Sequence, residues 1–97
     1  MKAYWIAHVD VTDPAQYVEY TQRGPAAIAK YGGKFLARGG RAEALEGRQT
    51  PQRTVVIEFE SYDQALACYQ SAEYQHALSH RQGAAKVEIV IVEGFEG

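Results

Sequence analysis

The stretch "AYWIAHVDV", residues 3–11, decides the fold, because apolar side chains occupy every second position in it. One face carries Ala3, Trp5, Ala7, Val9 and Val11. The other face carries Tyr4, Ile6, His8 and Asp10. Alternation with a period of two residues is typical of a β-strand with one well-buried face. The sequence therefore predicts a first strand over residues 3–11.

A helix is expected directly after this strand. Asp13 is a good N-cap and Pro14 suits the first helical position, and apolar residues then recur at helical spacing. The helix is expected over residues 14–31, with a bend at Gly24-Pro25. The pair Gly32-Gly33 can supply the left-handed backbone that ends it.

The rest of the chain repeats the pattern of strands around a helix. Strands are expected from Lys34, over residues 53–60 and over residues 86–94, and the turn residues of 46–52 suit a hairpin loop between the first two of these. Ser61 and Ser71 are both typical N-caps. They predict a helix through residue 70 that restarts and runs to about residue 82.

The order strand, helix, strand, strand, helix, strand predicts one α+β domain over residues 1–97. It is the ferredoxin-like βαββαβ pattern, in which a four-stranded antiparallel sheet of spatial order 4-1-3-2 carries its helices on one face. The core is expected to hold Trp5, Ala7, Val9, Phe35, Ala37, Val55, Ile57 and Phe59. The open face is expected to show Tyr4, Ile6, His8, Leu36, Arg38, Val56 and Glu58.

That open face is too apolar for a monomer to leave in water. A homodimer that pairs two such faces about a two-fold axis would cover them and enclose a cavity, which is the arrangement of a dimeric α/β-barrel.

Composition limits the partners. The formal net charge is -2 and the basic residues are scattered, so no nucleic acid partner is expected. No apolar run is long enough to span a bilayer, and the amino terminus lacks the uniform apolar core of a signal peptide, so no membrane partner is expected. The single cysteine, Cys68, cannot form an internal disulfide, which fits a reducing cytoplasm.

A row of polar residues on the open face is the first candidate site. If the hairpin between the second and third strands closes around residue 48, Arg38 lies opposite Glu58, with His8 on the next strand. A bulge at Gly39-Gly40 would shift this register by one residue. In such a row Arg38 would bind the anionic group of a ligand, Glu58 would orient Arg38, and His8 would move a proton. The same residues could instead form a purely structural ion pair.

Two other clusters have structural and functional interpretations. Tyr69, Tyr74 and Arg81 either pack a helix on the sheet or line a substrate pocket at its edge. His76 and His80 lie four residues apart near Glu73, but this is a bare pair on a polar helix face, so no metal is expected. The glycines lack the arrangement of a phosphate-binding loop, so no nucleotide is expected, and the site is predicted to work without a cofactor.

Several segments together resemble the family called domain of unknown function 1330, within the dimeric α/β-barrel superfamily. They are "YGGKFLARGG" at 31–40, "LEG" at 45–47, "PQRTVVIEF" at 51–59, "CYQSAEYQ" at 68–75 and "IVEG" at 91–94. The matching positions are Gly32, Gly33, Arg38, Gly39, Gly40, Glu58, Tyr69, Ser71, Tyr74 and Arg81. Many members carry an aromatic residue where this chain has Cys68, so a pocket wall there is expected to differ.

The resemblance implies a ferredoxin-like homodimer and no particular reaction, because the superfamily hosts chemistries as different as cofactor-free oxygenation and lactone isomerisation. Two functions remain open. One is binding, with or without conversion, of a small polar or aromatic acid or carbonyl compound in a cavity of the homodimer. The other is a non-catalytic dimeric binding or regulatory module.

Overall fold

The computed structural model describes residues 1–96. Its strands are β1 (Ala3–Val11), β2 (Lys34–Arg38), β3 (Arg53–Phe59) and β4 (Ala85–Glu93). Its helices are α1 (Pro14–Lys30), α2 (Tyr62–Gln70) and α3 (Ala72–Ser79). All predicted elements are present, and α1 continues through Pro25 to Lys30.

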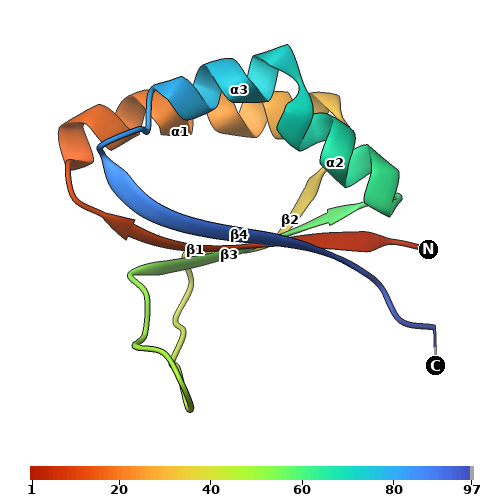
Figure 1. Cartoon of the computed structure of the whole chain (residues 1–97), viewed down its shortest axis with the longest axis horizontal. Coiled ribbons are helices and arrows are strands. Elements are labelled where there is room, and N and C mark those ends of the chain that lie inside the picture. The colour runs from red at the N-terminus through yellow and green to blue at the C-terminus, as the bar shows by residue number, and fades with distance from the viewer. Residues whose placement is uncertain (97) are drawn as a thin grey trace.

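The four strands form one antiparallel sheet in the order β2-β3-β1-β4. This is the predicted 4-1-3-2 order, read from the other edge. All three helices lie on one face of the sheet and leave the other face open (Figure 1). The expected ferredoxin-like α+β architecture is therefore confirmed.

The helix-covered face of the sheet holds an aromatic core. Trp5 stacks on Phe59 with ring centroids 6.0 Å apart and meets Tyr74 edge-on at 4.9 Å. Trp5, Tyr74, Phe59 and Ile57 are among the largest fully buried side chains. The alternation of β1 and β3 predicted this face correctly, because Trp5 lies opposite Ile57 in the ladder.

The predicted helix caps are present. Asp13 accepts a hydrogen bond from the Gln16 amide, and Ser61 accepts one from the Gln64 amide. Ser71 Oγ accepts from the Tyr74 amide at 3.1 Å and donates to the Cys68 carbonyl at 2.7 Å. Ser71 thus ends α2 and starts α3, so a single side chain makes the corner between the two helices.

The register of β2 differs from the expectation. Phe35 lies opposite Ile57, but Ala37 lies opposite Val56 and Arg38 opposite Val55, with a bulge at Leu36. One extra residue reverses the alternation of everything that follows it. The predicted pairing of Arg38 with Glu58 is therefore wrong, and Lys34 holds the place opposite Glu58.

The bulge also exchanges the faces of two residues. Val55 lies opposite Ala7, which is buried, so Arg38 projects to the helix-covered side. Ala37 lies opposite Val56, which is on the open face, and Ala37 is itself exposed. Its predicted place in the core is therefore also wrong.

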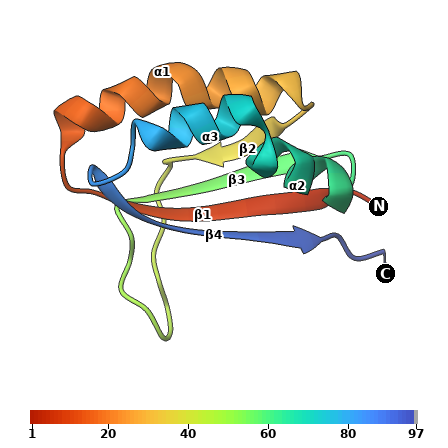
Figure 2. The ribbon, with the colours of Figure 1, turned by 45° about the horizontal axis from the view of Figure 1, so that its top comes forward.

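Residues 39–52 form an arm between β2 and β3. The arm extends from the sheet on the side away from the helices (Figures 1 and 2). Leu45, near its tip, is 84% exposed. Arg48 forms an ion pair with Glu88 of β4, and Gln52 bonds Asp10 of β1, so the base of the arm is fixed on the open face.

The open face also exposes apolar side chains. Ile6 lies opposite Val56 on one neighbouring strand and opposite Val90 on the other, and Val90 is 60% exposed. Leu36 and Val92 are exposed as well. The expected apolar character of this face is thus present.

Candidate functional site

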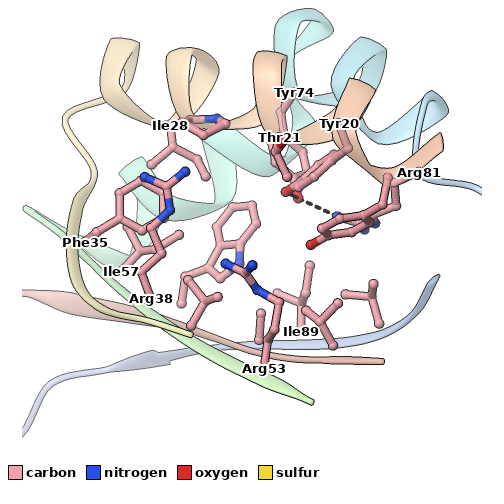
Figure 3. Close-up of a pocket in the computed structure, with 17 residues that line it drawn as sticks. Tyr20, Thr21, Ile28, Phe35, Arg38, Arg53, Ile57, Tyr74, Arg81 and Ile89 are labelled. Atoms are coloured by element: carbon pink, nitrogen blue, oxygen red, sulfur yellow. Dashed lines mark hydrogen bonds between the residues drawn. The ribbon is translucent and has the colours of Figure 1, made fainter. Parts of the chain in front are cut away.

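A cavity lies between the sheet and α1, on the helix-covered side. Figure 3 shows the residues that line it. The sheet contributes Trp5, Val55 and Ile57 to the lining. The helices contribute Tyr17, Tyr20 and Ile28 from α1 and Tyr74 from α3. Its volume is about 50 Å³, room for a few water molecules at about 10–15 Å³ each.

Three arginines surround this mostly apolar space. Arg38 comes from the end of β2, Arg53 from the start of β3, and Arg81 from the turn after α3. None of the three lies within 4.0 Å of a carboxylate among residues 1–96. Arg81 is buried, Arg53 is partly buried and Arg38 is exposed. A charge that is removed from water without a counter-charge is costly, so Arg81 and Arg53 need an explanation other than stability.

Each sheet arginine is held loosely. The Arg38 guanidinium carbon lies 4.5 Å from the centre of the Phe35 ring, a cation–π contact. Arg53 Nε is buried and finds no hydrogen-bond partner in the described part of the chain. A Cβ atom at Gly39 would lie 3.3 Å from Arg53 Cζ, so the glycine gives the Arg53 guanidinium its space.

Arg81 is held by two tyrosines. It is only 8% exposed, and it donates to the Tyr74 hydroxyl at 2.8 Å. The hydroxyls of Tyr74 and Tyr20 lie 2.7 Å apart, and the Arg81 guanidinium carbon lies 4.9 Å from the centre of the Tyr20 ring. The dashed line in Figure 3 marks hydrogen bonding within this group.

Burial controls the ionisation of the neighbouring phenols. Removal from water raises the pKa of Tyr74 well above its usual range, and it raises the pKa of Tyr17 as well. Both hydroxyls therefore keep their protons near neutral pH. The cavity wall is neutral apart from its three positive charges.

None of the 17 residues that line the cavity carries a carboxylate, an imidazole or a thiol. A general base or a nucleophile of the usual kinds is thus absent from the described lining. The arrangement suits the binding of an anion with an apolar body, through charge-assisted hydrogen bonds from the arginines.

The structure separates the residues of the predicted row. Arg38 lines the cavity, whereas His8 and Glu58 lie on the open face. His8 lies opposite Thr54, with Nδ1 3.4 Å from its Oγ1. Thr54 is four residues from Glu58 along β3, about 13 Å at 3.3 Å per residue, so His8 and Glu58 do not touch. The predicted row is therefore wrong as a geometric unit.

Glu58 has a different neighbour from the one expected. Its carboxylate lies 3.7 Å from Lys2 Nζ and orients no arginine. Because Arg38 is on the other face of the sheet, Glu58 cannot hold its guanidinium. Catalytic roles for His8 and Glu58 stay predictions.

The second predicted cluster is largely brought together. Tyr74 and Arg81 are hydrogen-bonded at the cavity. Tyr69 lies behind them, with its ring centre 5.5 Å from that of Tyr74, and it lines a neighbouring groove of about 310 Å³. Arg81, Val87 and Ile89 line both the cavity and this groove.

Two residues of the site were missed. Arg53 has the same parity as Val55, Ile57 and Phe59, so the alternation of β3 already placed it on the core face. Tyr20 belongs to the apolar stripe of α1, a pattern that by itself indicates packing. A charge on a core-facing position is the signal that could have found Arg53.

The structure places no third metal-ligating side chain beside His76 and His80 among residues 1–96. The rings of His76 and His80 lie 5.0 Å apart, and no group of three potential metal-ligating side chains occurs in residues 1–96. Over the same residues, no helix is both long enough and apolar enough to cross a membrane.

Solved structures share this fold. A protein of unknown function from Rhodopseudomonas palustris aligns with a TM-score of 0.73 at 18% identity, over 99% of this chain and 84% of that chain. A dimeric ferredoxin-like protein of unknown function from Bacteroides fragilis gives 0.64 at 13% identity, over 96% of both chains. SnoaB, a cofactor-independent oxygenase from Streptomyces nogalater, gives 0.62 at 11% identity, over 99% of this chain and 95% of that chain.

Identities this low show a common fold and nothing more about activity. A search of curated proteins finds no match to the chain. One family comparison covers nearly the whole sequence, since the family's model matches residues 2–95. The chain belongs to the family described as domain of unknown function (DUF1330).

Proposed function

We propose that this protein binds a small organic acid with an apolar, preferably aromatic body, and that it does so as a homodimer. The observation that carries the proposal is the set of three arginines around an apolar cavity with no carboxylate within salt-bridge distance among residues 1–96. An anionic ligand supplies the missing counter-charge.

The apolar residues of the lining would contact the apolar body of the ligand. Trp5, Phe35 and Ile57 offer flat and branched apolar surface beside the guanidinium groups. The cavity alone is far smaller than the roughly 300–1,000 Å³ of common ligand pockets. The adjoining groove shares Arg81, Val87 and Ile89 with it, and we propose that a ring-sized ligand extends from one into the other.

The absence of a carboxylate, imidazole or thiol from the described lining favours binding over conversion. Of the two functions that the sequence left open, the proposal is therefore the first, in its form without conversion of the ligand. The site differs from the expected one in place, because it lies between sheet and helices of one subunit.

The homodimer rests on the open face. Leu36 of β2 and Val90 and Val92 of β4 are exposed, and Ile6 and Val56 are partly exposed. The arm of residues 39–52 projects on the side of the sheet away from the helices (Figure 1). A patch of this kind is typical of an interface. The structural neighbour from Bacteroides fragilis is described as dimeric.

Tryptophan fluorescence tests the ligand class directly, because Trp5 is the only tryptophan and lines the cavity. We expect benzoate and phenylacetate to change the emission and to raise the melting temperature, while benzamide, of similar shape but uncharged, does neither. Equal responses to benzoate and benzamide would contradict the proposal.

Variants locate the effect. Arg38→Met and Arg53→Met should each weaken benzoate binding about tenfold or more, since a hydrogen bond to a charged group contributes roughly 1.5–3 kcal/mol. Arg41→Met is the matched control, because Arg41 is exposed and does not line the cavity. If all three variants bind like the unchanged protein, the arginine cavity is not the site.

A further inference from the structure

The hydrogen bonds of Tyr20, Tyr74 and Arg81 define more of the ligand than its charge. Each phenolic hydroxyl has one proton to donate and two acceptor positions. Tyr74 Oη accepts from Arg81 Nη1 and lies 2.7 Å from Tyr20 Oη. The one remaining question is which tyrosine donates to the other.

Burial favours one of the two arrangements. Tyr74 is completely buried, and within residues 1–96 its hydroxyl has no partner other than Arg81 and Tyr20. If Tyr20 donated to Tyr74, the Tyr74 proton would be buried without an acceptor, at a cost of about 1–3 kcal/mol. The burial of Tyr74 therefore favours donation from Tyr74 to Tyr20, which is the more exposed of the two.

This leaves the hydroxyl proton of Tyr20 without an acceptor in the described part of the chain. Tyr20 lines the cavity and is partly exposed to it, so its proton is available to a ligand. The chain of donors from Arg81 through Tyr74 polarises the Tyr20 hydroxyl and strengthens its hydrogen bond to an acceptor.

Gly24 sets the position of this donor. The Tyr20 ring lies against the α1 backbone one turn further on, where a Cβ on Gly24 would be 2.9 Å from Tyr20 Cζ. A side chain at residue 24 would push the ring away from Tyr74. The glycine therefore keeps Tyr20 in its bonded place.

We propose that the ligand carries an acidic phenol or enol group, which the site binds in its ionised form with the oxyanion at the Tyr20 hydroxyl. This inference rests on the proposed function and adds a second group to the ligand. The positive field of Arg81 and the Tyr20 hydrogen bond both favour the anion over the neutral form. The proton released by the ligand goes to solvent, because the described lining holds no base to take it.

The test uses 4-nitrophenol, whose phenolate is coloured and whose neutral form is not. We expect the pKa of the bound probe to be lower than that of the free probe by about one unit, a tenfold change in the ratio of the ionised to the neutral form. An absorbance titration against pH with saturating protein measures it. The uncharged 4-nitroanisole, of similar shape, should bind weakly.

Tyr20→Phe removes the donor and keeps the ring. It should weaken binding of the phenolate about tenfold and bring the pKa of the bound probe back toward that of the free probe. Tyr31→Phe is the control, since Tyr31 is partly buried against the core and does not line the cavity. Circular dichroism checks that both variants fold.

Three outcomes would overturn the inference: a bound probe with an unchanged or raised pKa, a Tyr20→Phe protein that behaves like the control, or no binding of 4-nitrophenol at all. Each can occur while benzoate still binds and Arg53→Met still weakens that binding. In that case the proposed function stands and only the phenol or enol group is rejected.

Discussion

The two faces of the sheet use charged residues in opposite ways. On the open face, Arg48 pairs with Glu88 and Lys2 with Glu58, so positive and negative groups neutralise each other in water. On the helix-covered face, Arg38, Arg53 and Arg81 gather without a carboxylate within 4.0 Å among residues 1–96.

Surface ion pairs contribute little free energy and are common on solvated faces. Guanidinium groups that are buried or partly buried without a carboxylate nearby, as those of Arg81 and Arg53 are, are uncommon because desolvation penalises them. The comparison therefore points to the covered face as the binding site and to the open face as a contact surface.

The largest contrast is expected in stability. Ile57→Ala removes a fully buried side chain from the covered face and should lower the free energy of unfolding by about 2–5 kcal/mol. Its neighbour Val56 is on the open face, and Val56→Ala should cost less than about 1 kcal/mol at low protein concentration. Urea unfolding measures both, and equal losses would break the distinction between the faces.

A charge on the open face tests its role in association. Val90→Asp places a carboxylate in the apolar patch and should convert dimers to monomers, because a desolvated unpaired charge costs several kcal/mol. Val18→Asp, on the exposed side of α1, should leave the dimer intact. Sedimentation velocity distinguishes the species. A Val90→Asp protein that remains dimeric would exclude this face as the interface.

The buried thiol of Cys68, on α2, should make the stability of the protein depend on pH. Burial raises the pKa of the Cys68 thiol to about 11, from an ordinary value of 9.0. The folded state then binds this proton more tightly than the unfolded state, so the contribution is complete below pH 9 and is lost as the pH rises toward 11.

The loss should be on the order of 3 kcal/mol, because one pKa unit corresponds to about 1.4 kcal/mol. Cys68→Ala should flatten this part of the stability curve, while Tyr17 and Tyr74, whose pKa values are raised in the same direction, leave a residual slope. Urea unfolding at several pH values provides the curve. An unchanged slope in the variant would show that the thiol ionises freely in the folded protein.

The smallest effect on stability is expected at Gly24. Gly24→Ala gains about 0.5–1 kcal/mol of helix propensity but displaces Tyr20 and removes the partner of the Tyr74 hydroxyl, which costs about 1–3 kcal/mol, so the net loss should not exceed about 2 kcal/mol. The affinity for 4-nitrophenolate should nevertheless fall.

The reverse change at an exposed position of the same helix, Ala26→Gly, is the control. It should reduce stability by about 0.5–1 kcal/mol and leave the affinity unchanged. Parallel changes in stability and affinity for both variants would show that Gly24 acts on the helix alone.

Local signals were enough to predict the fold. Asp13, Ser61 and Ser71 are caps in the structure as predicted, and Gly32 has the positive φ, 80°, that was expected after the first helix. The strand order also followed, because few ways exist to pack this order of elements into two layers.

The site was only partly predictable, because it depends on a register. Tyr74 and Arg81 were found as neighbours, whereas Arg38 was assigned to the wrong face. The bulge at Leu36 is set by pairing with β3 and by the packing of Phe35, which are not local properties of residues 34–38. The pair Gly39-Gly40 suggested a bulge after the strand, whereas the structure has the bulge within β2, at Leu36.

The corner at Ser71 gives α2 and α3 different main supports. α2 packs on the sheet, where its residues Ala65 and Cys68 are buried, whereas α3 packs on α1. The wall of the cavity that carries Tyr20 and Tyr74 therefore belongs to the α1–α3 pair. A substitution that shifts either helix of this pair should therefore move both phenols, because Tyr20 and Tyr74 are hydrogen-bonded across it.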